Sequence, residues 1–257
     1  MTSARVELFV IGDEILSGKR QDRHFRQVVA MLQARGIALS AAQFIGDDIA
    51  QIADAIRRVR QAGDVLLSCG GIGATPDDCT RQAAAQAFDR PLEVHAQALA
   101  LIEARYGMQA HPNRALMAQF PREADLIPNP VNQVAGFSVD HCYFVPGFPE
   151  MAWPMLEWVL DQRLMDLHQA QPPVEYSLRV TGPHGEGDLL DLMQATLKAF
   201  PGIKLSSLPS RGADGGAPHI EFGLRGPQQQ AAAAYVWFNQ QMQQVEGVQV
   251  EALCAPD

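Results

Sequence analysis

Residues 70–80, GGIGATPDDCT, combine three glycines with two adjacent carboxylates, Asp77 and Asp78. They follow an apolar run at 65–68 and precede a run typical of a helix at 81–88. Glycines let the backbone approach a phosphate, and the first turn of a helix offers free N–H groups to an anion. Because two carboxylates would repel a phosphate, a cation is expected between them. The segment therefore indicates a phosphorylated ligand held together with a divalent cation.

The same residues also fit a structural role. Asp77 or Asp78 could cap the helix that begins near Thr80, and glycines after a strand are common turn residues. Cys79 lies inside the acidic loop with no adjacent basic residue to lower the pKa of its thiol. An incidental cysteine is therefore favoured over a nucleophile.

Three predicted strands, over residues 6–11, 37–45 and 65–68, each end in a polar or glycine-rich turn. Helical spacing of apolar residues fills the intervals, at 23–35 and 49–62. Strands that alternate with helices predict a mostly parallel sheet covered on both faces, with ligands beyond the carboxyl ends of the strands. We therefore expect the turns to meet at one edge of the sheet. Their chemically useful residues are Gly12, Asp13, Glu14, Asp47, Gly70, Gly71, Gly73, Thr75, Asp77, Asp78 and Thr80.

A Pro-rich linker at residues 169–173 predicts two domains, 1–170 and 174–254. The first continues with expected helices at 93–106, 113–120 and 155–167 and a strand at 142–145. The second has the order strand, helix, strand, strand, helix, strand, which is typical of a small α+β domain. Its polar segment at 209–217 is expected to be a mobile loop.

Composition excludes several classes of function. The net charge of −9 disfavours nucleic-acid binding through phosphate neutralisation, although one small anionic ligand remains compatible with it. The four cysteines include no CxxC pair, so neither a zinc site nor a redox dithiol is indicated. The N-terminus lacks a signal-peptide pattern and no apolar run is long enough to span a membrane, so we expect a cytoplasmic protein.

Five motifs occur together in one order: GDEILSG at 12–18, the glycine loop at 70–80, NPV at 129–131, GF at 136–137 and VPGFPEM at 145–151. In this order the chain resembles the molybdopterin-binding (MoaB/Mog-like) superfamily. It is most similar to the N-terminal part of the competence/damage-inducible protein A family. Residues 174–254 resemble the small domain that follows in that family. The sequence ends at Asp257, so the resemblance implies a short form that lacks the amidase domain.

The resemblance implies a three-layer α/β fold with a site for a phosphorylated pterin or a nucleotide at the strand ends. The family's functional aspartate matches Asp78, and a second acidic position matches Asp47. It also implies metal-dependent hydrolysis of ADP-ribose-type pyrophosphates and self-association, most simply as a dimer. The apolar segments at 203–205 and 220–222 could pair or pack across the dimer axis. The chain departs from the family at Arg23-His24, at Ala74 and at residues 132–136, NQVAG.

These observations favour a metal-dependent nucleotide pyrophosphatase in which Asp47, Asp77 and Asp78 hold Mg²⁺, Mn²⁺ or Co²⁺ and serve catalysis. A module that binds molybdopterin or a nucleotide without turnover is the alternative, and a regulatory subunit with a vestigial pocket is a third. The expected partners are a small phosphorylated ligand and a second copy of the chain. No nucleic acid or membrane is expected. The residues expected to bind the ligand are Gly12, Asp13, Glu14, Gly70, Gly71, Gly73, Thr75, Thr80, Asn129, Gly147 and Glu150.

Overall fold

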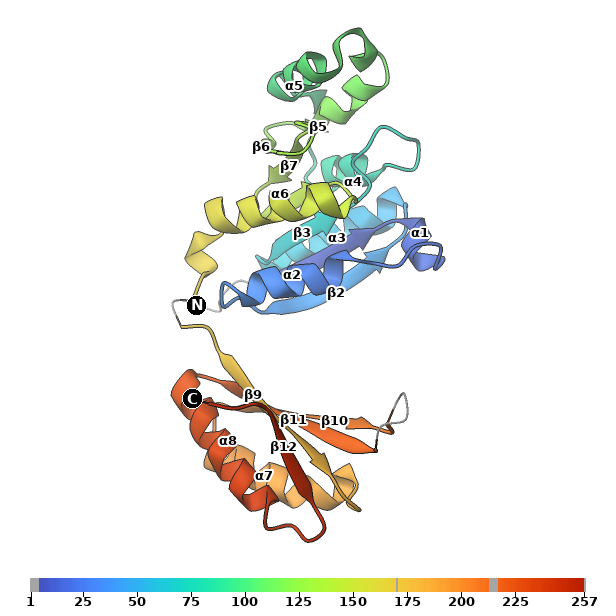
Figure 1. Cartoon of the computed structure of the whole chain (residues 1–257). Helices are drawn as coiled ribbons and strands as arrows, with labels where there is room; N and C mark the ends of the chain where they lie inside the picture. Colours follow the sequence, from blue (N-terminus) through green and yellow to red (C-terminus); the bar gives the residue numbers. More distant parts are fainter. Residues whose placement is uncertain (1–4, 170, 213–216, 257) are drawn as a thin grey trace. The chain divides into compact units, whose positions relative to one another are not determined.

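A computed structural model describes residues 5–169, 171–212 and 217–256. They form two compact units, Met1–Gln169 and Ala170–Asp257 (Figure 1). The division falls at the start of the Pro-rich segment. Of the loop expected at 209–217, residues 213–216 lie outside the described part of the chain, and its first two residues end a strand instead.

The first unit is built on a six-stranded sheet with the order β2-β1-β3-β8-β7-β6. β2, β1, β3 and β8 run parallel to one another, whereas β7 pairs antiparallel with β8 and β6 pairs antiparallel with β7. This arrangement confirms the predicted α/β class with a mostly parallel sheet. The strands are β1 (Val6–Ile11), β2 (Leu39–Ile45), β3 (Val65–Cys69), β6 (Asp125–Ile127), β7 (Gly136–Val139) and β8 (Cys142–Val145).

Helices cover both faces of this sheet, which gives the three expected layers. Along β1, Leu8 and Val10 pack into one core with the first pair of helices, while Phe9 and Ile11 pack into the other core with the second pair. Because both faces are buried, β1 reads as an unbroken apolar run rather than an alternating one. The first pair is α2 (His24–Gln33) and α6 (Pro149–Gln162), and the second is α3 (Ile49–Ala62) and α4 (Thr80–Ala87).

The ends of α3 show how the sequence sets a helix beside the site. The Asp48 side chain accepts a hydrogen bond from the Gln51 backbone N–H, and Gly63 ends the helix with a φ of 70°. These are the usual cap residues at the two ends of a helix. Asp47, which precedes the cap, is thereby held at the carboxyl end of β2.

The helix expected at 155–167 begins earlier, because α6 starts at Pro149. Proline suits the first turn of a helix, where its missing N–H would have no partner. Glu150 therefore lies in the first turn of α6 and not in a loop. Two short segments complete this part of the unit: α1 (Asp13–Leu16) follows β1, and η3 (Met165–Leu167) follows α6.

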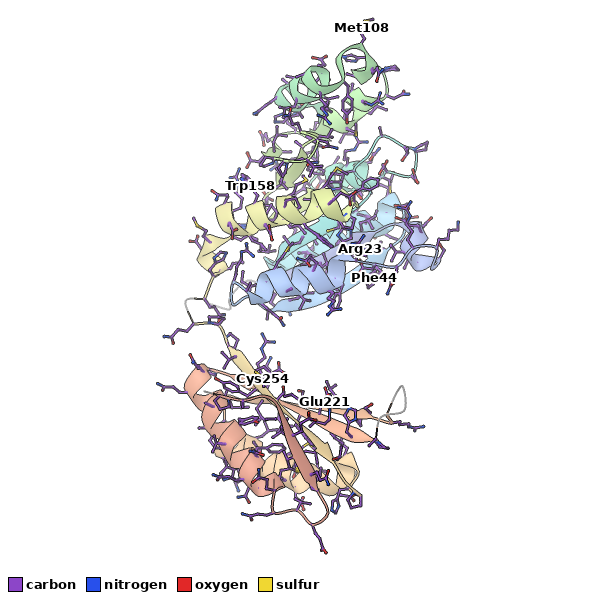
Figure 2. All side chains as sticks on the ribbon, viewed as in Figure 1. Arg23, Phe44, Met108, Trp158, Glu221 and Cys254 are labelled. Carbon is purple, nitrogen blue, oxygen red and sulfur yellow. The ribbon has the colours of Figure 1, made fainter. Side chains whose placement is uncertain are left out.

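Two expected helices between α4 and β6 differ from the structure. We call residues 92–121 the insertion. Residues 92–94 form a strand, β4 (Leu92–Val94), that pairs with β5 (Gln119–Pro121), so the helix expected at 93–106 begins only after His95. In place of the helix expected at 113–120 there is a 3₁₀ turn and β5. Met108 projects from this insertion with 97% of its surface exposed (Figure 2). The remaining elements are α5 (Ala96–Tyr106), η1 (Gly107–Ala110) and η2 (Arg114–Ala118).

The second unit is a four-stranded antiparallel sheet with the order β10-β11-β9-β12. Phe222 and Leu178 on the sheet pack against Phe238 of α8, so one face is covered by helices. Ile203, Ile220 and Phe222 are buried inside this unit, so their side chains are not available to pack across a dimer axis. Pairing of strands across such an axis stays a prediction. The elements are β9 (Val174–Thr181), η4 (Glu186–Leu189), α7 (Leu190–Ala199), β10 (Lys204–Ser210), β11 (His219–Gly226), α8 (Gln228–Met242) and β12 (Gln249–Cys254).

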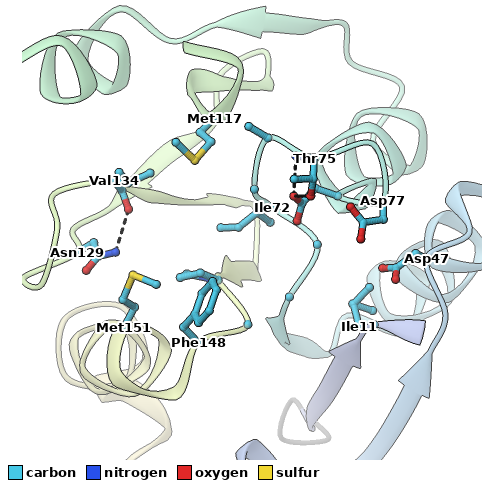
Figure 3. Close-up of a pocket in the computed structure, with 18 of the residues that line it drawn as sticks. Ile11, Asp47, Ile72, Thr75, Asp77, Met117, Asn129, Val134, Phe148 and Met151 are labelled. Carbon is cyan, nitrogen blue, oxygen red and sulfur yellow. Dashed lines mark hydrogen bonds between the residues drawn. The ribbon is translucent and has the colours of Figure 1, made fainter. Parts of the chain in front are cut away.

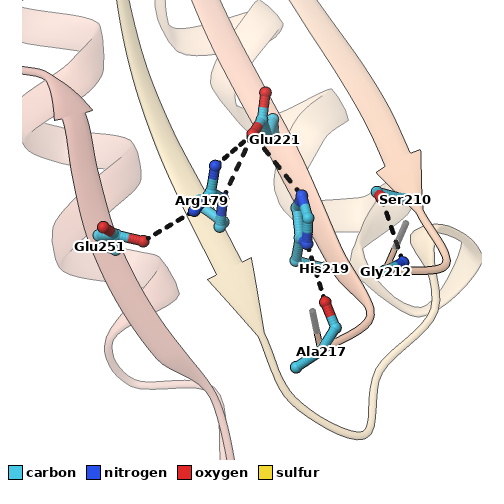
Figure 4. A network of polar contacts seen from close by, with 7 residues as sticks. All are labelled: Arg179, Ser210, Gly212, Ala217, His219, Glu221 and Glu251. Carbon is cyan, nitrogen blue, oxygen red and sulfur yellow. Dashed lines mark hydrogen bonds and ion pairs between the residues drawn. The ribbon is translucent and has the colours of Figure 1, made fainter. Parts of the chain in front are cut away.

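The other face of this second sheet carries a polar network (Figure 4). Arg179 contacts Glu221 at 2.8 Å and Glu251 at 3.2 Å, and His219 lies 3.6 Å from Glu221. These pairs join three neighbouring strands across the surface. They are partly exposed, so each contributes little to stability.

Across the described residues, no helix combines the length and apolar character needed to cross a membrane.

Candidate functional site

A pocket of about 420 Å³ opens where the turns after β1, β2, β3 and β8 come together (Figure 3). This volume lies in the range of small-molecule sites. Gly12 and Glu14 come from the first turn, Asp47 from the second and Gly147 from the fourth. The expected convergence of strand ends at one edge of the sheet is therefore present.

The glycine loop forms the floor of the pocket, and its glycines are required by geometry. Gly70 has a φ of 108°, and a Cβ there would collide with the carbonyl oxygen of Ile11. Gly71 has a φ of 69°, and a Cβ there would collide with the Thr80 hydroxyl. Gly147 packs against Gly70, because a Cβ at Gly147 would lie 3.4 Å from the Gly70 Cα. Side chains at Gly70 and Gly71 would collide with these neighbours, whereas a Cβ at Gly147 would make an ordinary van der Waals contact.

Thr80 fixes the direction in which the loop peptides point. Its hydroxyl donates to the Gly70 carbonyl at 3.0 Å, and its backbone N–H donates to the Gly71 carbonyl at 2.9 Å. Because a trans peptide is planar, with C=O and N–H opposed, the N–H groups of Gly71 and Ile72 point away from Thr80. None of the four N–H groups from Gly71 to Ala74 has a hydrogen-bond acceptor within the described residues. Consecutive free N–H groups of this kind make an anion-binding concavity.

Asp47 faces this floor and is held by Asp13. The Asp13 N–H donates to the Asp47 carboxylate at 2.9 Å, and the Asp47 N–H donates to the Asp13 carboxylate at 3.2 Å. Burial raises the pKa of Asp47, and the carboxylates of Asp13, Glu14 and Asp77 raise it further. The hydrogen bond from Asp13 lowers this pKa but does not cancel the rise. The wall is therefore a cluster of like charges.

Asp78 points back into its own loop. Its Oδ2 accepts hydrogen bonds from the Thr75 N–H at 2.9 Å and from the Thr75 hydroxyl at 2.5 Å. Hydrogen bonding by Thr75 also lowers the pKa of the exposed Asp77. The alternative that either aspartate caps α4 is not observed, because the N-cap is Cys79 and no side chain bonds to the helix end. Both carboxylates thus belong to the pocket.

The carboxylates do not form a complete metal site by themselves. No three His, Cys, Asp or Glu side chains in the described ranges 5–169, 171–212 and 217–256 are grouped to hold an ion. Mg²⁺ commonly takes only one or two carboxylates and completes its shell with waters and substrate phosphates. Asp47, Asp77 and Asp78 thus do not form a metal cage that is built before a ligand binds.

The opposite wall of the pocket is apolar and comes from three separate segments (Figure 3). Met117 belongs to the insertion, Val134 to the loop before β7, and Phe148 and Met151 to the start of α6. Phe148 is 54% exposed. The pocket therefore has a polar floor with an acidic side for charged groups, and an apolar side that suits a flat ring.

Asn129 and Asn132 line this wall and are held in place by hydrogen bonds of their side chains. The Asn129 amide donates to the Val134 carbonyl at 3.0 Å, and its oxygen accepts from the Val131 N–H. The Asn132 amide lies 3.1 Å from the Met151 sulfur, and its oxygen accepts from the Val134 N–H. The departure from the family at residues 132–136 thus yields a loop that is held by its own side chains.

Most of the predicted site residues line the pocket: Gly12, Glu14, Asp47, Gly70, Gly71, Gly73, Thr75, Asp77, Asp78, Asn129 and Gly147. Three predicted residues do not. Asp13 supports Asp47 from behind, and Thr80 is fully buried beneath the loop. Glu150 lies in the first turn of α6, outside the lining.

A comparison with protein families identifies the part of the chain that holds this pocket. A model described as a probable molybdopterin binding domain matches residues 7–166, which include every residue of the pocket. The chain belongs to this family. The CinA protein of Thermoplasma acidophilum, a solved structure, aligns with a TM-score of 0.57 at 26% identity, over 64% of this chain and 99% of that one.

Curated relatives are named CinA-like, in agreement with the resemblance of the motifs. One from Geobacter metallireducens is 34% identical over 160 residues, 60% of this chain and 39% of that protein. An Escherichia coli K12 protein named NMN amidohydrolase-like protein YfaY is 31% identical over 244 residues, 91% of this chain and 59% of that protein. This CinA-like chain thus spans 39% to 59% of the length of these two relatives. That it is a short form without an amidase domain stays a prediction.

Sequence reasoning missed two buried side chains of this molybdopterin-binding domain. His24 is 5% exposed, and its Nε2 lies 3.0 Å from the Gly147 carbonyl. Arg81 is 3% exposed and donates to the Gly73 carbonyl. The only available signal was position, since each is a basic residue at the start of a helix that leads away from the site.

Cys79 is buried beside the acidic wall, and burial raises the pKa of its thiol to about 11. The thiol is therefore protonated at neutral pH, which favours the incidental role over a nucleophile.

Proposed function

We propose that the pocket binds a nucleotide diphosphate, of the ADP-ribose type, and hydrolyses it with the help of a divalent cation. The observation that carries this proposal is the row of four free N–H groups, from Gly71 to Ala74, beside the carboxylates of Asp47, Asp77 and Asp78. The N–H groups suit phosphate oxygens, whereas the carboxylates would repel them. A cation between the two sets resolves this conflict.

Each part of the pocket has a role in the proposed reaction. The glycine loop would orient the diphosphate, and the apolar wall at Phe148 and Met151 would hold the planar base. A divalent cation, when bound, would neutralise the diphosphate and activate water, as metals do in other hydrolases. Water would add across the P–O–P linkage, so that ADP-ribose would give AMP and ribose 5-phosphate.

A binding role without turnover is the second candidate, with molybdopterin or a nucleotide as the ligand. It is supported by the family description and by the lack of a three-residue metal cluster among the described side chains. The name of the Escherichia coli relative points to a nucleotide as well, but that protein is longer than the matched part.

A thermal-shift panel tests the proposal. ADP-ribose, FAD, NAD, ATP and molybdopterin would each be added with and without Mg²⁺, Mn²⁺ or Co²⁺. A ligand at 100 times its Kd adds about 2.7 kcal/mol to the free energy of unfolding. We expect this gain with ADP-ribose only when a metal is present, and its loss in Asp78→Asn. Asp54→Asn, which alters an exposed carboxylate on α3, is the control that should keep it.

Stabilisation by molybdopterin alone would favour the second candidate. Equal stabilisation of Asp78→Asn and the wild-type protein would remove Asp78 from the site.

We also propose that the protein forms a homo-oligomer, most simply a dimer, because two-fold assemblies are the commonest kind. Light scattering should give about twice the 28.0 kDa chain mass. A single chain mass at all concentrations would contradict this proposal.

A further inference from the structure

Arg81 is a buried cation next to the glycine loop, and the proposed function gives it no role. It belongs to the first turn of α4 and is 3% exposed. One guanidinium nitrogen, Nη2, donates to the Gly73 carbonyl at 2.5 Å. The other, Nη1, donates to the Leu116 carbonyl and lies 3.5 Å from the Gln119 carbonyl. The Nε is buried without a partner.

The charge of Arg81 has no counterion. Within the described residues no carboxylate lies within ion-pair distance of its guanidinium, in contrast to Arg58, which pairs with Glu7 at 2.7 Å. Burial lowers the pKa of Arg81, and the more distant Asp78 raises it. An arginine nevertheless stays protonated inside proteins. Because a buried charge without a counterion is unfavourable, an anion bound nearby would be stabilised by Arg81.

The two carbonyl contacts join separate walls of the pocket. Gly73 belongs to the glycine loop, and Leu116 belongs to the insertion, one residue before the pocket-lining Met117. The Gly73 carbonyl points to Arg81, so the planar peptide directs the Ala74 N–H the opposite way. Arg81 thus binds the carbonyl of Gly73, just as Thr80 binds the carbonyls of Gly70 and Gly71.

We propose that Arg81 is a positioning residue for anion binding: it fixes the glycine loop and the Met117 wall in one arrangement, and its charge complements a phosphate bound at residues 71–74. The second half of this proposal rests on the proposed function, since the phosphate is that of the nucleotide. The first half does not, because it concerns the protein without a ligand. A nucleotide diphosphate needs both the charge of Arg81 and the fixed walls, since its phosphate charge must be balanced and its base must reach the apolar wall.

Three full-length variants test the proposal. Arg81→Gln removes the charge and one of the two contacts. Arg81→Lys keeps the charge, but a single ammonium lacks the fork that spans two carbonyls. Arg105→Gln removes an exposed arginine of the same insertion and serves as the matched control. Amide hydrogen exchange of the free protein would be followed in residues 75–80, where the N–H groups of Thr75, Asp78 and Thr80 are hydrogen-bonded, and in residues 107–118. Affinity for ADP-ribose with Mg²⁺ would be measured by calorimetry at low and high salt.

For Arg81→Gln we expect faster exchange in both segments and an affinity lower by about tenfold or more, with a weaker salt dependence. For Arg81→Lys we expect faster exchange but an affinity closer to wild type, because the charge remains. A residue that acts only in packing would give equal losses of affinity in both variants. Arg105→Gln should match the wild-type protein throughout.

The readouts separate the two proposals. If the wild-type protein does not bind ADP-ribose, the proposed function fails, while exchange in the free protein still decides whether Arg81 joins the two walls. Wild-type exchange in Arg81→Gln, or equal loss of affinity with glutamine and lysine, would overturn the inference. Should Arg81→Gln fail to fold, Arg81→Lys decides alone. Unchanged exchange at 107–118 in that variant would contradict the proposal that Arg81 joins the glycine loop to the Met117 wall.

Discussion

Asp47 is a residue at which the free protein bears an electrostatic conflict in the site. Burial and three neighbouring carboxylates raise its pKa, and the one hydrogen bond from Asp13 offsets them only in part. Arg20 is the only cation among the described residues that line the pocket. Sites that bind charged ligands often keep such conflicts at the expense of stability. The conflict disappears if a cation lies among the carboxylates.

Replacing Asp47 should therefore stabilise the free protein. The folded-state pKa is raised, so the cost of the charge is present above that pKa and vanishes as the pH falls through it. We expect Asp47→Asn to raise the Tm of the first unit by about 1–2 °C at pH 7, because the charges are partly exposed. The gain should disappear in acid. The asparagine oxygen can still accept from the Asp13 N–H.

Calorimetry across pH measures this gain. Asp54→Asn, which breaks an exposed pair with Arg57, should bring no gain. A Tm of Asp47→Asn below that of the wild-type protein at pH 7 would show that Asp47 is a structural residue.

At the scale of elements, the site depends on turns that bring strand ends close together. The tightest approach is between β1 and β3, where Gly70 faces the Ile11 carbonyl. Gly70→Ala places a Cβ against that backbone atom and also requires a positive φ. We expect it to destabilise the first unit by about 2 kcal/mol or more, through strain and displacement of the loop.

Gly18→Ala is the matched control for this substitution. Gly18 has a similar positive φ of 71°, but a Cβ there meets no atom within 4 Å. It should cost only about 1 kcal/mol. Urea unfolding of both variants measures the difference. Equal losses would mean that the close approach to Ile11 does not constrain the loop.

The sequence predicted the elements whose signals are local. β1 and α3 have clear periodicity and caps, and the alternation of strands and helices was enough to bring Gly12, Asp47 and the glycine loop to one edge. The insertion was not predicted, because the short strands β4 and β5 pair only with each other across 24 intervening residues. The roles of His24 and Arg81 depend on carbonyls that are distant in sequence, at Gly147 and Leu116. Such contacts leave no periodic pattern.

For the whole molecule, the division into two units predicts independent folding. All pocket residues lie in the first unit, which has its own two cores. A fragment of residues 1–169 should therefore fold cooperatively and bind ADP-ribose with metal as the full chain does. Calorimetry of the fragment and the full chain would compare the two affinities. A folded fragment that binds nothing would show that the second unit completes the site.

We propose that the pocket cleaves a diphosphate with a cation shared between the ligand and the carboxylates of the site. The release of AMP from ADP-ribose by purified protein with Mg²⁺ or Mn²⁺, before and after chelation by EDTA, measures this cleavage directly. We expect turnover that stops with EDTA, returns with added metal and is lost in Asp78→Asn. Undiminished cleavage in excess EDTA, or no cleavage with any metal despite clear pterin binding, would contradict it.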